Sequence, residues 1–255
     1  MDLMITSSAE MKKITSLDDD KLWAGFDWEE TDKILSGEIK PRTLITSYPF
    51  PAIRYPQRGP LIAQELVSVF PNSCYMRRGI RSKLHEVIAK AKKKHFTSLI
   101  LTHTNSRGHD ELIIISLLNG ASAVFSVIDF IPRADIPNCA NPLSRRIYPE
   151  LHMKSFDSQA SVGTARMIQA LFPKVTSSGG RPVAWFQKQN NHIFFRSHRF
   201  CYEEALSGES SSVRRQVQEC GPRFALKLKA VERVSFETGK FKLLCVVNHC
   251  KTDFV

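Results

Sequence analysis

The sequence predicts an α/β protein built from two related halves, and three observations support this. Strand and helix patterns follow the same order twice, first over residues 41–132 and again over 133–255. Two pairs of sequence landmarks recur at nearly equal spacing. Near the end of the second half, residues 223–230 alternate strictly between apolar and mostly cationic side chains, as a strand with one buried face requires.

The first half contains two strand patterns, two helical patterns and three further strands. The strands are predicted over 42–48, 73–79, 97–103, 111–118 and 122–130. The helices are predicted over 61–70 and 80–96, where apolar residues recur at intervals of three and four. Pro71 ends the first helix, and Asn119-Gly120 is a strong signal for a hairpin turn between two of the strands.

The second half repeats this plan with a single helix. Its strands are predicted over 152–156, 181–189, 191–202, 214–222 and 223–230. The helix is predicted over 161–172, with Val162, Ala165, Ile168 and Leu171 along its apolar side.

The spacing of the landmarks indicates a duplication. LVSVFP ends at Pro71 and IQALFP ends at Pro173, 102 residues later, while the turn glycines Gly120 and Gly221 lie 101 residues apart. Helix ends and turn glycines mark element boundaries, so a constant offset between them indicates two copies of one unit. Coincidence is the alternative, because both motifs are common.

The charge of the chain is strongly basic and unevenly distributed. The formal net charge is +11, yet residues 1–40 carry ten acidic and five basic side chains. The basic remainder favours a polyanion as partner, whether RNA, DNA or an anionic membrane surface, with a merely solubilising surface as the alternative. We see no apolar run of transmembrane length and no secretory signal, so the six cysteines are expected to be reduced thiols in an intracellular protein.

The acidic segment at residues 1–40 is expected to be partly disordered. It nevertheless contains three large aromatic residues, Trp23, Phe26 and Trp28, which a simple disordered spacer rarely holds. We therefore expect it to dock either on a partner or on the basic face of the protein itself.

Catalytic and metal-binding motifs are not evident. No phosphate-binding glycine loop, GxSxG turn or HExxH helix occurs, and the pairs Asp110-Glu111 and Glu203-Glu204 are most simply solvated turn residues. The cysteines include no CxxC pair, and Cys245 with Cys250 is a weak metal signal on its own. We expect no enzyme activity, no cofactor and no metal.

Three basic clusters are the candidate binding residues, and we expect all of them to contact RNA. The first surrounds Gly79 at a predicted helix start, where free backbone amides also attract phosphate. The second alternates with phenylalanines, which suits stacking on unpaired bases, and the third shares the cationic side of 223–230. Their members are Arg77, Arg78, Arg81 and Lys83; Arg196, His198 and Arg199; and Arg223, Lys227 and Lys229. Solvated surface is the alternative for each cluster, and Phe195 is expected to lie in the core.

Several motifs together carry a family resemblance. They are LITS at 44–47, PNSCYMRRG at 71–79, FTSLILTH at 96–103, LLNGASAVFSV at 117–127, FPKV at 172–175, and NHIFFRSHRF followed by ECGPRFALKL. Over about residues 41–241 the chain resembles the Brix-domain proteins of ribosome assembly. The arginine pair before Gly79 resembles the branch that acts on the large subunit.

The resemblance implies a Brix domain of two halves, each similar to the anticodon-binding domain of some tRNA synthetases. It also implies a non-catalytic nuclear, nucleolar role in which the protein binds precursor ribosomal RNA of the large subunit. Other pre-60S assembly factors are the implied partners, one of them helical, and no membrane is involved. The chain departs from the family at Tyr48-Pro49-Phe50-Pro51, where an RNA-contacting Asp-Arg-Pro is usual. The alternatives are a small-subunit member working with the U3 particle, a protein-docking scaffold with little RNA contact, and an RNA-modifying enzyme.

Overall fold

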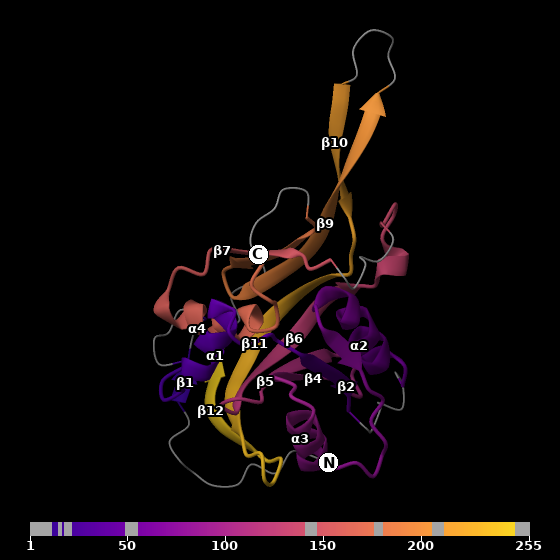
Figure 1. The fold of residues 1–255 in the computed structure, drawn as a ribbon. Coiled ribbons are helices and arrows are strands. Elements are labelled where there is room, and N and C mark those ends of the chain that lie inside the picture. Colours follow the sequence, from indigo (N-terminus) through magenta and orange to yellow (C-terminus); the bar gives the residue numbers. More distant parts are fainter. Residues whose placement is uncertain are drawn as a thin grey trace.

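The chain folds around one mixed β-sheet of twelve strands (Figure 1). The computed structural model describes residues 12–14, 17, 22–48, 56–140, 147–175, 181–205 and 212–247. The main strand order is β3-β2-β4-β5-β6-β11-β9-β8-β7, while β12 pairs with β11 and β1, and β10 pairs with β9. The strands of both halves therefore belong to one sheet.

The elements of the first half match the predicted order. They are β2 (Thr43–Ser47), α2 (Arg58–Val69), β3 (Ser73–Tyr75), α3 (Leu84–Lys93), β4 (Ser98–Thr104), β5 (Asp110–Ser116) and β6 (Ala121–Ile131), followed by the short 3-10 helix η1 (Arg133–Asp135). The helix α3 begins at Leu84, later than predicted, so the basic segment before it is a loop.

The second half contains one helix and six strands among the described residues. They are β7 (Glu150–Lys154), α4 (Gln159–Gln169), β8 (Val183–Gln189), β9 (His192–Ala205), β10 (Ser212–Glu219), β11 (Arg223–Val234) and β12 (Phe241–Val247). Two elements precede the first half: β1 (Lys12–Ile14) and α1 (Glu29–Ser36), neither of which the sequence patterns predicted.

The strand pairing confirms the duplication. In the first half the parallel neighbours β2 and β4 are followed by antiparallel β5 and β6; in the second, parallel β7 and β8 are followed by antiparallel β9 and β11. The two final strands, β6 and β11, pair antiparallel and join the halves. The landmark glycines precede these two strands with positive φ values, 74° at Gly120 and 54° at Gly221, a conformation that favours glycine.

The two faces of the sheet are covered differently. On one face, α2 and α4 pack on a core that includes Phe125, Phe186, Phe195 and Phe224. On the other face, α3 packs on the first half. Among the described residues, the second half has no helix equivalent to α3 between α4 and β8. One face of its strands therefore lacks a helical cover within the described part of the chain.

The N-terminal segment packs on the chain itself. Trp23 is 7% exposed, and its indole Nε1 donates a hydrogen bond of 3.0 Å to Thr164 Oγ1 in α4. A Cβ atom added at Gly163 would lie 2.4 Å from Trp23 Cδ1, so only glycine admits the indole at this position. Of the two docking alternatives, the structure shows the chain's own surface, but the surface is α4 and not a basic strand face.

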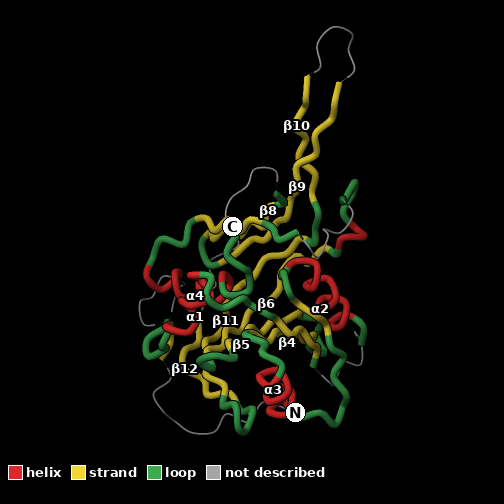
Figure 2. The backbone as a smooth tube through the Cα atoms, in the orientation of Figure 1, coloured by secondary structure: helices red, strands yellow, loops and turns green. Residues whose placement is uncertain are grey.

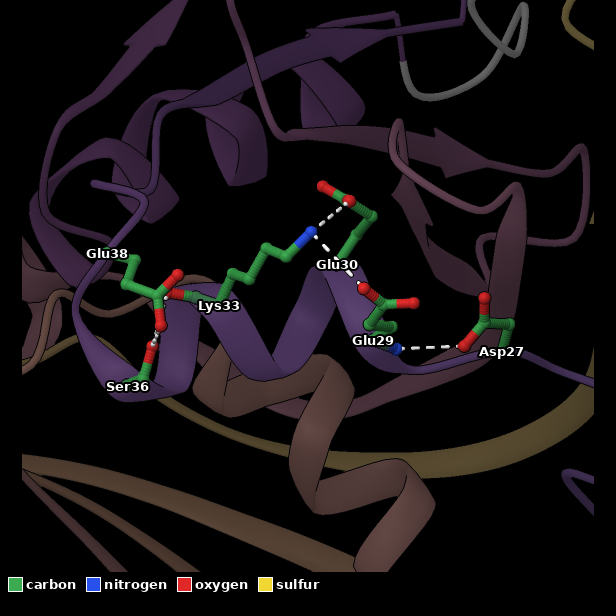
Figure 3. Close-up of polar contacts among 6 residues, drawn as sticks. All are labelled: Asp27, Glu29, Glu30, Lys33, Ser36 and Glu38. Carbon is green, nitrogen blue, oxygen red and sulfur yellow. Dashed lines mark hydrogen bonds and ion pairs between the residues drawn. The ribbon is translucent and has the colours of Figure 1, made fainter.

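The helix α1 beside Trp23 carries a local network of charges (Figure 3). The Lys33 ammonium lies 2.7 Å from a Glu30 carboxylate oxygen and 3.4 Å from one of Glu29. The hydrogen bond and charge of Glu30 raise the pKa of Lys33. Asp27 accepts a hydrogen bond from the Glu29 amide at the start of the helix. Acidic side chains in the first turn also suit the helix dipole.

The prediction that Val162 lies on the buried side of α4 is wrong. Val162 is 39% exposed, whereas Ala165, Ile168 and Leu171 are buried as predicted. Thr164 is fully buried, and its hydroxyl accepts the hydrogen bond from Trp23. The buried side of α4 therefore includes a polar residue against which the N-terminal segment packs.

The strands β9 and β10 form a long ribbon that extends beyond the rest of the molecule (Figure 2). They pair antiparallel from the His198–Glu219 pair to the Ala205–Ser212 pair. Val217 on this ribbon is 58% exposed.

No helix in the described part of the chain combines the length and apolarity needed to cross a bilayer.

Candidate functional site

The candidate site is the helix-free face of the second half. Strand β8 contributes Trp185 and Gln187, and β9 contributes Phe194 and Arg196 opposite them, in the register Trp185–Arg196 and Gln187–Phe194. Successive side chains of a strand point to opposite faces, so these four residues share one face while their neighbours enter the core. With Gln189 and His198 they line an open groove of about 280 Å³. We call this surface the open face.

Aromatic rings on the open face are partly exposed and ordered by stacking. The Trp185 indole stacks on the His152 imidazole of β7, with ring centroids 5.7 Å apart and an interplanar angle of 19°. His152 in turn lies 3.1 Å from a Glu150 carboxylate oxygen, measured from Nε2. A stacked neighbour that is itself in contact with Glu150 restricts the rotamers of Trp185, so its ring is oriented before any ligand arrives.

Two cations of the open face form no ion pair with a carboxylate among the described residues. Arg196 donates one hydrogen bond of 2.7 Å, from Nη1 to the carbonyl of Phe195. Its charge also contributes, after the larger effect of Arg223, to lowering the pKa of Glu219. Lys227 of β11 lies opposite His192 of β9 and is partly exposed. Both cations can therefore offer hydrogen bonds and charge to an anion.

The other two cations of the β11 cluster, which the sequence predicted as RNA contacts, form ion pairs within the chain. Arg223 donates from Nε and Nη2 to the two carboxylate oxygens of Glu219, at 2.8 and 2.7 Å. This bidentate pair lowers the pKa of Glu219 and raises that of Arg223. Lys229 lies 2.5 Å from a carboxylate oxygen of Glu111 in β5. Glu219 and Glu111 thus neutralise the charges of Arg223 and Lys229, two ion pairs that the sequence pattern did not predict.

The β9 cluster divides between the two faces of the sheet. Arg196 and His198 lie on the open face, but Arg199 points the other way and donates two hydrogen bonds, of 3.0 and 2.8 Å, to Gln218 Oε1. Adjacent residues of a strand cannot share a face, so Arg199 is a contact within the β9–β10 ribbon. Phe195 is fully buried, as predicted.

The first basic cluster forms the loop between β3 and α3, at the opposite end of the strand order from β8. Arg77, Arg81 and Lys83 are exposed there. Arg78 instead donates from Nε and Nη2 to the Ser82 carbonyl, at 2.9 and 2.8 Å, and burial lowers its pKa. The structure therefore places Arg196, His198 and Lys227 on one face of the sheet and leaves this loop as a separate basic surface.

Within the described residues, no three histidine, cysteine or acidic side chains gather as metal ligands. Cys250 of the weak Cys245–Cys250 signal lies outside the described ranges, and so does the whole Pro49–Pro51 segment.

The partly buried carboxyl of Glu232, in β11, makes folding stability depend on pH. Burial and then the charge of Glu111 raise the pKa of Glu232 to about 7. Because the folded pKa lies above the unfolded value, the associated stabilisation is present below about pH 4.5 and is lost as the pH rises through 7. Glu232→Gln should therefore leave the free energy of unfolding nearly unchanged at pH 4.5 and raise it by about 1–3 kcal/mol at pH 8.5. Urea titrations of both proteins at the two pH values check this, and an equal effect at both would contradict the pKa.

Sequence reasoning missed Trp185, Gln187 and His152. The alternation of Val183, Trp185 and Gln187 with Ala184 and Phe186 was visible as a strand pattern. The sequence predicted a single helix for the second half, but which side of β8 that helix covers depends on tertiary packing.

The fold and the site together define a single-sheet α/β protein of two like halves that presents an open basic and aromatic face. The Brix domain matches residues 55–230, so the chain belongs to the Brix-domain family. It is 31% identical to ribosome production factor 1 of Pongo abelii over 214 residues, covering 82% of this chain and 57% of that protein. It is 28% identical to a Brix domain-containing protein of Schizosaccharomyces pombe over 216 residues, covering 84% of this chain and 68% of that protein.

Ribosome production factor 1 of Saccharomyces cerevisiae is 28% identical over 171 residues, covering 67% of this chain and 55% of that protein. The chain thus spans little more than half the length of several relatives. Among solved structures, a probable ribosomal biogenesis protein of Aeropyrum pernix superposes with a TM-score of 0.49 at 14% identity, covering 73% of this chain and 96% of that one.

Proposed function

We propose that the protein is a non-catalytic ribosome-biogenesis factor that binds precursor ribosomal RNA of the large subunit through the open face. The observation that carries this proposal is that partly exposed aromatic rings share one face of the second half with cations that form no ion pair among the described residues. The names of the relatives supply the process, ribosome production, and the net charge of +11 favours a polyanion. A nucleolar location, pre-60S particles and a helical partner protein belong to the same proposal.

The chemistry of the open face suits RNA. Arginine and lysine neutralise phosphates and release condensed counterions, which gives affinity that falls steeply with salt. The exposed loop residues Arg77, Arg81 and Lys83 offer a second contact to a large RNA at some distance from the open face. Arg223 and Lys229 contribute less, because Glu219 and Glu111 already neutralise them.

Charge reversal on the open face tests the proposal. Binding of a large-subunit rRNA fragment is measured by fluorescence anisotropy as a function of salt, for the wild type and for Arg196→Glu combined with Lys227→Glu. Removing two phosphate contacts should reduce the slope of log affinity against log salt by about two and weaken binding at least about tenfold.

The matched control is Lys240→Glu, which makes the same kind of charge change in the exposed turn between β11 and β12. We expect it to change the affinity by less than about twofold, since a remote surface charge is screened by salt. An unchanged affinity and slope in the double variant would reject RNA binding by the open face.

A further inference from the structure

The groove on the open face has the chemical composition of a nucleotide site. Its lining consists of two aromatic rings, two carboxamides, one guanidinium and one imidazole, with no carboxylate: Trp185, Gln187, Gln189, Phe194, Arg196 and His198. An anionic ligand with a planar polar ring could stack on the aromatic rings, form hydrogen bonds with the carboxamides and place its charge beside the guanidinium.

The rings and the amides are placed for different parts of such a ligand. Trp185 is held by its stack on His152 and offers a flat surface on which a base can stack. Gln187 and Gln189 are two apart on β8 and share the face, opposite Phe194 and His192 of β9. Each carboxamide carries donors and acceptors, which match the hydrogen-bonding edges of a base.

The size and shape of the groove favour a single nucleotide. Its volume of about 280 Å³ lies at the lower end of small-molecule sites, too little for a stacked duplex step. In an A-form duplex the base faces are stacked and the major-groove edges are out of reach of side chains. Only an unpaired base can present its face to Trp185 while its phosphate approaches Arg196.

We propose that this groove binds one unpaired nucleotide of RNA, with the base stacked on Trp185 or Phe194, its edge on the glutamine amides and its phosphate on Arg196. This inference rests on the proposed function and deepens it: the protein then selects a loop, bulge or single-stranded segment of ribosomal RNA over duplex.

The test uses the whole chain and two RNA probes of one sequence, a twelve-nucleotide single strand and the same strand annealed to its complement. Wild-type protein should bind the single strand at least about tenfold more tightly than the duplex. Trp185→Leu should reduce single-strand affinity about tenfold, since one base–aromatic stack is lost, while Trp185→Phe retains most of it. Duplex affinity should be the same in all three proteins.

A second measurement needs no variant protein. Single strands that each carry one abasic residue are bound to the wild type, and one position should lose about tenfold in affinity while the others change little.

The outcomes separate the two proposals. Equal binding of single strand and duplex, with no effect of Trp185→Leu or of any abasic residue, would overturn the nucleotide site and leave RNA binding intact. Failure to bind either RNA at low salt would overturn the proposed function and this inference with it.

Discussion

Trp23→Ala should lower the free energy of unfolding by about 3–5 kcal/mol, the usual cost of removing a buried aromatic side chain. Trp23 is almost fully buried, fits against Gly163 without a Cβ between them, and donates to the Thr164 hydroxyl. Its removal leaves both a cavity and a buried hydroxyl that has lost its partner. Urea denaturation followed by circular dichroism gives the value.

Trp28→Ala is the matched control for Trp23→Ala. Trp28 lies on the same segment but is partly exposed, with a cation–π contact to Arg166 at 5.9 Å. We expect it to cost less, about 1–2 kcal/mol, because Trp28 is only partly buried and contributes an edge contact to the Trp23 ring besides the cation–π contact. If both tryptophan variants cost the same small amount, the N-terminal segment would not be part of the folded core.

Phe195→Ala should mainly lower folding stability, whereas Phe194→Ala should mainly weaken RNA binding, although the two residues are adjacent. Phe195 is fully buried, with its ring centroid 4.8 Å from that of Phe186 and 4.7 Å from that of Phe224. Its removal should cost about 3–5 kcal/mol of folding free energy. Phe194 faces the open groove, so its removal should cost about 1 kcal/mol or less and weaken single-stranded RNA binding about tenfold.

Urea denaturation gives the stability of both variants, and fluorescence anisotropy gives their RNA affinity; both are measured on the same preparations. RNA affinity of Phe195→Ala is measured well below its lowered transition temperature, where it should be close to that of the wild type. A loss of RNA affinity in Phe195→Ala that exceeds the loss in Phe194→Ala would contradict the assignment of the two faces.

The secondary structure and the duplication were predictable because they depend on local patterns. Strand alternation over 223–230 correctly placed Phe224, Leu226 and Leu228 in the core. The landmark glycines predicted the turns before β6 and β11, because a positive φ is needed there. Such signals depend on residues close together in the sequence, so they can be recognised without knowledge of tertiary contacts.

The candidate site was only partly predictable because charge pairing is a long-range property. Lys229 is neutralised by Glu111, which lies 118 residues earlier. Arg223 pairs with Glu219, only four residues earlier, but the bend between β10 and β11 that brings them together is not evident from strand alternation. The sequence pattern of cations therefore predicted which side of the strand they occupy and gave no information on their ion pairs.

Photochemical crosslinking tests the central claim, that the open face binds RNA, most directly. Large-subunit rRNA fragments containing 4-thiouridine are irradiated with the wild-type protein, and the modified peptides are identified by mass spectrometry. We predict adducts on β8, β9 and β11, at or beside Trp185, Phe194 and Lys227. Adducts confined to α2 and α4, on the opposite face of the sheet, would contradict the claim.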